Sequence, residues 1–250
     1  MLPRTYHISI TIFCICAFAL YSCGEPPAPQ AQSQQSTESI VEDMGEHFEQ
    51  VSSIKKAVTR GDLDDVPEAA NWMAANHTLL GAPEGWGSQI RELRTAARTA
   101  AQAQDSESAA SATASMSRAC GKCHEAVGTT PRMPELGTRG LPPADQVNTV
   151  PHMLRHYWAI EQMWIGLVNP SEESWNKGAE ALRDVPLEPQ KMTGNAEMTA
   201  DVGNWAKAVH ELSDKTAQAK DWDSRARLYG ELLATCAQCH QNLELAINLS

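Results

Sequence analysis

Strand-forming patterns are absent from this chain of 250 residues. Aromatic residues make up only 6% of it, and no segment shows the Val-, Ile- or Tyr-rich alternation that marks a half-buried strand. Alanine instead recurs in long runs of mixed polar and apolar residues, and alanine is the strongest helix former. We therefore expect an all-α fold, and the length allows one large domain or two small ones.

Positive charge is also scarce. The chain contains 20 Lys and Arg residues against 31 Asp and Glu residues, which gives a formal net charge of −11. Proteins that bind nucleic acid need a basic surface for the phosphates, so this balance argues against a nucleic-acid partner. An acidic surface suits docking to a basic partner protein, although it also serves solubility alone.

The chain contains one long apolar run, at residues 8–20, which follows Arg4. The run has the length of a signal-peptide hydrophobic region and is too short for a comfortable membrane span. It ends in Leu-Tyr-Ser-Cys-Gly, which resembles a bacterial lipobox with Cys23 as the lipidated residue. We expect residues 1–22 to be a lipoprotein signal peptide and the mature protein to be periplasmic and membrane-anchored. An ordinary secretory signal cleaved nearby is the alternative.

Proline, glycine and Gln/Ser tracts divide the remaining chain. They predict a flexible tether at 23–37 and a linker at 128–147. Between and after these segments, apolar residues recur at three- and four-residue steps, as on one face of a helix. We expect four helices in residues 38–127 and four more in residues 148–243.

No cysteine is left over for a disulfide or a reactive thiol. Of seven cysteines, Cys14, Cys16 and Cys23 fall in the signal and lipobox. The other four form two C-x-x-C-H motifs, which consist of Cys120, Cys123 and His124 in the first copy and Cys236, Cys239 and His240 in the second.

The C-x-x-C-H spacing is the attachment signature of a c-type haem. Residues at i, i+3 and i+4 share one face of a helix, so two thiols can bond the two vinyl groups of one porphyrin. The histidine that follows is then held under the iron as its proximal ligand. A zinc site is the main alternative, but it usually needs two further Cys or His ligands in a compact loop, and neither motif has them nearby. A thiol–disulfide pair is the other alternative. We expect two covalently bound haem c groups.

The two halves of the chain repeat each other. The segment Ala101–Asp105 (AQAQD) matches Ala217–Asp221 (AQAKD) at an offset of 116 residues. The segment Met44–Phe48 (MGEHF) matches Met153–Tyr157 (MLRHY) at an offset of 109 residues. The two offsets differ because the loops between the matching segments differ in length. This repeat predicts two tandem four-helix bundles, each with a haem motif at its C-terminal end.

A four-helix unit that ends in C-x-x-C-H resembles the class II cytochromes c, the cytochrome c′-type bundles, here in a duplicated form. The resemblance covers about residues 39–124 and 148–240. It implies electron transfer with redox partner proteins or, where the iron has an open position, binding of NO or CO. It does not imply an enzyme. Dihaem peroxidases resemble paired class I domains, and the late position of both motifs argues against them.

In such bundles the sixth iron ligand comes from the first helix. The repeat offers His47 and Met44 in one half and His156 and Met153 in the other. His47 and His156 are preferred, because a repeated histidine on an apolar helix face needs a reason, whereas methionine there is usually core. Bis-histidine ligation gives a low potential, His–Met ligation gives a higher one, and no sixth ligand leaves an open site.

The remaining histidines give weaker signals. We expect His77, His152 and His210 to be surface or capping residues, and His152 and His210 remain alternatives for the second iron. The sequence sets neither the oligomeric state nor which membrane holds the lipid.

Overall fold

The computed structural model describes residues 29–76, 85–131, 149–183 and 196–243, and this part of the chain is all-helical, as expected. It contains eight α-helices and one short 3₁₀ helix, η1. Their bounds are α1 Pro29–Arg60, η1 Leu63–Asp65, α2 Val66–Ala75, α3 Gly87–Ala101, α4 Ser106–Val127, α5 Thr149–Val168, α6 Glu172–Ala181, α8 Ala196–Gln218 and α9 Trp222–Leu243.

Local signals explain several helix ends. Gly61 follows α1 with a φ of +81°, a left-handed conformation that favours glycine, and so it stops the helix. Asp105 caps α4, because its Oδ1 accepts a hydrogen bond from the backbone N–H of Ser108 at 2.7 Å. For α6 the sequence, with Asn169 before Pro170, predicts a cap at Asn169, but this prediction is wrong. Ser171 takes that place, and its hydroxyl accepts from the N–H of Ser174 at 3.2 Å.

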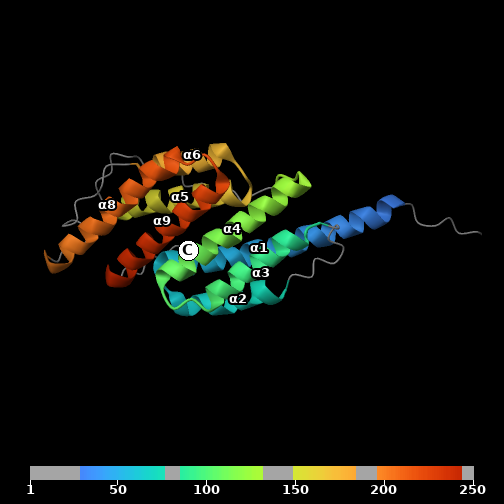
Figure 1. Ribbon diagram of the computed structural model, residues 1–250, viewed down its shortest axis with the longest axis horizontal. Helices are drawn as coiled ribbons and strands as arrows, with labels where there is room; N and C mark the ends of the chain where they lie inside the picture. Colours follow the sequence, from blue (N-terminus) through green and yellow to red (C-terminus); the bar gives the residue numbers. More distant parts are fainter. Residues whose placement is uncertain (1–28, 77–84, 132–148, 184–195, 244–250) are drawn as a thin grey trace, which may run out of the picture.

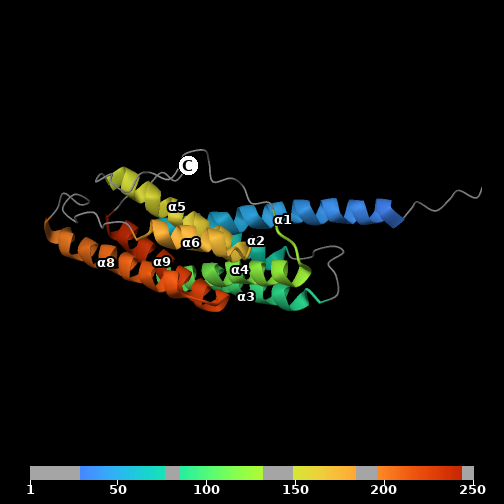
Figure 2. The same cartoon turned by 90° about the horizontal axis from the view of Figure 1, so that it is seen from above.

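The structure begins α1 at Pro29, within the segment 23–37 for which the composition predicts a tether. After Pro29 this segment contains no further proline and no glycine. Proline is tolerated in the first turn of a helix, and glutamine is a good helix former. Figures 1 and 2 show that the first turns of α1 project beyond the other helices.

Within each half, successive helices pack side by side. In the first half α1 packs on α2, α2 on α3 and α3 on α4, and α4 returns to α1. The order α5, α6, α8, α9 repeats this arrangement in the second half, where α9 returns to α5. The repeat also relates buried positions, because Val51 and Ile54 match Ile160 and Met163 and all four are at most 2% exposed.

The two halves share one hydrophobic core. The two motif-bearing helices, α4 and α9, pack along each other in the middle of the molecule (Figure 1). Small residues permit this close approach, since Gly230 of α9 lies over Ala114 and Ser111 of α4. In addition α1 packs on α9, and α5 packs on α4. Each half therefore covers the motif helix of the other.

Several predictions lie outside the described residues. They are the signal peptide at 1–22, the lipidation site Cys23, most of the linker at 128–147, and His77. Among the described residues, none of the helices combines the length and the apolar character that crossing a membrane requires.

Candidate functional site

The second C-x-x-C-H motif lies at the end of α9 and lines a pocket between α5, α8 and α9. Cys236, Cys239 and His240 contribute to its wall. From α5 come Met153 and His156, the two residues that the repeat nominates as distal ligands for this half. The structure thus brings together both parts of the predicted second site. Most of the remaining lining is apolar and comes from α5 and α8, including Ile160, Val202, Trp205 and Val209.

His240 is oriented by a backbone carbonyl. Its Nδ1 lies 2.7 Å from the carbonyl oxygen of Thr59, near the C-terminal end of α1. A carbonyl only accepts, so Nδ1 carries the proton and donates it, which leaves the lone pair on Nε2. A histidine fixed in this way has the tautomer and the ring orientation of a metal ligand.

His124 makes the corresponding hydrogen bond from the first half to the second. Its Nδ1 donates to the carbonyl oxygen of Val168 at 2.7 Å, at the C-terminal end of α5. Thr59 and Val168 are related by the same offset as Met44 and Met153. Each motif histidine is therefore held by the first helix of the opposite half, and the two contacts are reciprocal.

The residue after the first motif cysteine also contacts that opposite helix. A Cβ at Gly121 would overlap the carbonyl oxygen of Leu167, so only glycine fits there without movement. In the second motif Ala237 stands at the matching position, and its carbonyl oxygen lies against Gly61 just after α1. Backbone contact between motif and opposite helix is thus a feature of both sites.

The motif thiols are poorly suited to thiol–disulfide chemistry. Burial raises the pKa of Cys120 and of Cys236 to about 12, and the neighbouring thiol of each motif adds to the shift. Burial also raises the pKa of Cys239 to about 11. All four motif cysteines are free thiols in the structure. Because the thiolate is the reactive form, protonated thiols near neutral pH disfavour the disulfide-exchange alternative.

His156 of α5 has a buried nitrogen without a hydrogen-bond partner. Its Nε2 is inaccessible to solvent and has no hydrogen-bond partner. Burial, with smaller contributions from His152, His210 and His240, holds the pKa of His156 well below its usual value. The imidazole is therefore neutral near pH 7, and a neutral imidazole with an unused nitrogen is the form that binds metals.

His47, the counterpart of His156, is placed differently. It is buried on α1, and its Nε2 lies 2.9 Å from the carbonyl oxygen of Asn76, at the end of α2. Its ring also meets Trp72 edge-on, with centroids 5.3 Å apart. These contacts are with α2. If His47 is to bind a metal through Nε2, it must first release Asn76. Met44 is half-buried on the same helix.

His152 and His210 are not the surface or capping residues that we expected. His152 is only 7% exposed and lines the second pocket. Its ring centroid lies 4.3 Å from that of His156, and the ring centroids of His156 and His210 are 6.0 Å apart. The i, i+4 spacing of His152 and His156 was a usable sequence signal. Nothing local in the sequence points to His210, which comes from α8.

A buried ion pair between the halves borders this pocket. Lys55 of α1 donates to Glu161 of α5, and their side chains are 5% and 11% exposed. The ammonium also lies 5.1 Å from the ring centroid of Trp164. Tyr157, which lines the pocket, is linked to Glu161 by a hydrogen bond, and burial raises the pKa of Tyr157 to about 12. Charge is thus fixed close to the second site.

The chemistry of the pocket between α5, α8 and α9 suits a haem, but the volume of the pocket is small for one. It offers two thiols, a tautomerically fixed histidine, an unpartnered His156 nitrogen and an apolar lining. The space enclosed is only about 60 Å³, roughly that of two water molecules. A porphyrin therefore requires α5 and α8 to separate. α5 packs chiefly on α6 and α4, whereas α8 packs chiefly on α9 and α6.

Comparison of the chain with protein-family models, with curated proteins and with solved structures gave no match to any of them.

Proposed function

We propose that this chain is a dihaem c-type cytochrome that transfers electrons outside the cytoplasm, tethered to a membrane by a lipid on Cys23. The observation that supports it best is the pair of reciprocal hydrogen bonds, His240 to Thr59 and His124 to Val168. Both motif histidines present the same protonated Nδ1 to a carbonyl and keep Nε2 for a metal. A disulfide role for the motifs gives no reason for such matched histidines.

Each haem would supply one-electron chemistry, and the chain would set its environment. Cys120 and Cys123 would bond the first haem, and Cys236 and Cys239 the second. His124 and His240 would be the proximal ligands, held in orientation by the opposite half. Apolar residues of α5 and α8 would exclude water from the second iron. No side chain needs to act as an acid, base or nucleophile.

The organisation that we propose is two four-helix bundles of the class II cytochrome type. The cyclic packing of α1 to α4, repeated by α5, α6, α8 and α9, supports it. The close contact of α4 with α9 would bring the two haems into one structure rather than into two separate modules. Electrons would then pass between one redox partner, the two haems and a second partner.

For the distal ligands we propose His156 at the second haem, with Met153 as the alternative. The unpartnered Nε2 of His156 in the motif's own pocket supports this choice. At the first haem the choice is His47 or Met44. His47 binds there only if its hydrogen bond to Asn76 opens.

Haem attachment is tested by expressing the full chain in bacteria with an intact c-type maturation system. We expect two haems per chain by pyridine haemochrome assay and by intact mass. The double variant Cys236→Ala/Cys239→Ala should retain one haem, and Cys120→Ala/Cys123→Ala is its matched control, which should also retain one. A wild-type chain that is exported and folded but contains no covalent haem contradicts the proposal.

A gas-binding cytochrome is the second candidate function. The engagement of His47 with Asn76 favours it, because an engaged His47 leaves the first iron without a histidine on its distal side. Absorption spectra of the ferrous protein with and without CO separate the two functions. Rapid CO binding at both haems contradicts the electron carrier. Binding at neither haem contradicts the gas-binding function.

A further inference from the structure

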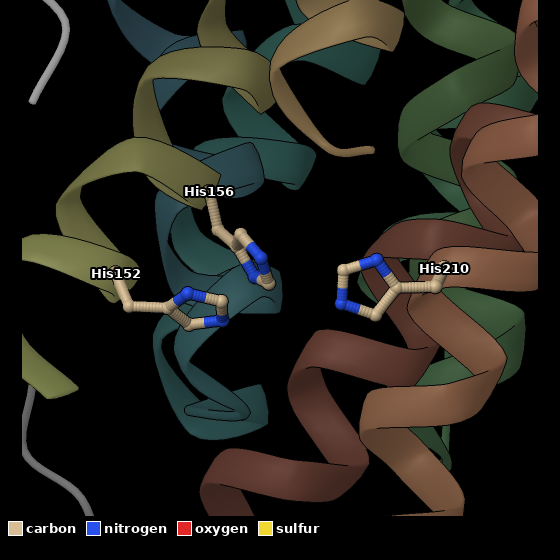
Figure 3. Close-up of side chains that lie close together, drawn as sticks. All are labelled: His152, His156 and His210. Atoms are coloured by element: carbon tan, nitrogen blue, oxygen red, sulfur yellow. The ribbon is translucent and has the colours of Figure 1, made fainter. Parts of the chain in front are cut away.

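Three histidines lie close together at the edge of the pocket between α5, α8 and α9. His152 and His156 lie one turn apart on α5, and His210 faces them from α8 (Figure 3). One ligand nitrogen from each side chain lies within 4.8 Å of the other two. Three nitrogens around one tetrahedral Zn²⁺ are about 3.4 Å apart, given Zn–N bonds of about 2.05 Å. Small rotations of the rings therefore suffice to close the set on one ion.

Two of these histidines have a buried nitrogen that the protein does not use. Nε2 of His156 and Nε2 of His210 are both buried and have no hydrogen-bond partner. Buried polar atoms without a hydrogen-bond partner are uncommon and energetically costly, so a ligand that engages these two nitrogens is expected. His210 also has a hydrogen bond to the backbone of Leu182, which fixes its ring as second partners fix metal-binding histidines.

The surroundings suit a cation bound by neutral imidazoles. Burial lowers the pKa of all three histidines, so they are not protonated near neutral pH. Asp214 acts electrostatically on His210 and favours positive charge there. Arg155 acts on His152 and His156 and disfavours positive charge on them. Imidazole nitrogens select zinc, copper and nickel over magnesium or calcium, which prefer oxygen ligands.

A haem alone does not account for this cluster. An iron that is bound by His240 on one face has a single position left on the other. At most one of the three histidines can fill it, and two remain. We propose that His152, His156 and His210 together form a non-haem site for a divalent transition-metal ion of the zinc class, with a fourth position open. Its ligands are separate from the haem-attaching cysteines, so the ion does not occupy the residues that would bond a haem covalently.

The site shares His156 with the second haem. The Nε2 of one imidazole binds one metal at a time. When the ion occupies the cluster, His156 is withdrawn from the second iron, whose sixth position passes to Met153 or stays open. Metal binding would thus change the coordination of one haem and leave the other unchanged.

The test is a titration of the purified full chain with Zn²⁺, followed by calorimetry and by metal analysis after gel filtration. We expect one zinc per chain in the wild type. His152→Ala and His210→Ala should each weaken the affinity by about tenfold or more. Thr113→Ala changes a buried side chain of the first half that belongs to neither site and is the control, which should keep the wild-type affinity. Helical circular dichroism verifies the fold of each variant.

X-ray absorption spectra at the zinc edge supply an independent readout. We expect three nitrogen ligands at about 2.0 Å in the wild type and fewer in His210→Gln. Absence of stoichiometric zinc in a folded wild-type chain, or an affinity that is unaltered in both His152→Ala and His210→Ala, overturns the metal site. Haem content measured on the same samples tests the cytochrome proposal separately, because none of these variants changes a motif cysteine.

Discussion

Nδ1 of His240 lies 2.7 Å from the carbonyl oxygen of Thr59, although 181 residues separate them in the chain. The bond joins the last helix of the second half to the first helix of the first half. His124 and Val168 form the matching bond in the opposite sense. Orientation of either motif histidine therefore depends on how the two halves dock.

A first prediction concerns this docking. Gly121→Ala should destabilise the protein by about 1–3 kcal/mol, because the added Cβ overlaps the carbonyl oxygen of Leu167 and pushes α4 away from α5. The measurement is denaturant unfolding followed by circular dichroism. Gly45→Ala is the control, since nothing lies within 4 Å of a Cβ there. The control should be neutral or slightly stabilising. Equal stability of the two variants contradicts the close contact.

A second prediction concerns the buried ion pair. Lys55→Met should destabilise the fold by about 3–5 kcal/mol, because it leaves the Glu161 carboxylate buried without its partner. The double variant Lys55→Met/Glu161→Leu should recover most of that loss. Unfolding free energies of the four members of this cycle give the coupling. Additive effects of the two substitutions contradict a coupled pair. Lys177→Met breaks an exposed pair and should change stability by less than about 1 kcal/mol.

A third prediction concerns the distal ligands. His156→Ala should remove the low-spin signal of one haem from the ferric EPR spectrum, and Met153→Ala should leave that signal unchanged. His47→Ala should affect only the other haem, if His47 has exchanged Asn76 for iron. Unchanged spectra in His156→Ala remove our first choice for the second haem, and a change only in Met153→Ala points to His–Met ligation.

A fourth prediction concerns pH and the chain without attached haem. Burial holds the pKa of His156, His124 and His240 below the usual value of 6.5. Above about pH 6.5 these histidines are neutral in both folded and unfolded chains, so they do not oppose folding. As the pH falls below this value the unfolded chain takes up protons first, and the free energy of unfolding decreases.

Unfolding measured between pH 7.5 and pH 5 tests the pH prediction. His156→Leu should show a shallower decrease than the wild type, because it removes the histidine with the largest shift. A decrease of the same size in this variant contradicts the assignment of the effect to His156.

The helices were largely predictable from the sequence, because their boundaries depend on local residues. Asp105 and Gly61 act through their own backbone and their nearest neighbours. At α6 the Asn169-Pro170 sequence predicts a cap at Asn169, but the helix is capped two residues later, by Ser171.

The candidate site was predictable only in part. The motifs and the residues Met153 and His156 follow from the repeat, and the structure places them in one pocket. The carbonyl partners of His124 and His240 did not follow, since no local pattern states which helix end the other half presents. The sequence offered His210 only as an alternative ligand for the second iron, because α8 brings it to α5 only in the folded chain. The contacts of His47 with α2 were likewise invisible in the sequence.

The reciprocal hydrogen bonds also have a consequence for how such a chain could arise. When each half gives the other the same group, the contact is self-complementary, as in a two-fold symmetric homodimer. A single half contains both the donor histidine and the acceptor helix end, so two copies of it could satisfy each other. The duplicated chain is thus built like a dimer whose subunits became one polypeptide. The two halves have since diverged, because His152 and His210 match Asp43 and Arg94 in the first half, and only His156 has a histidine counterpart, His47.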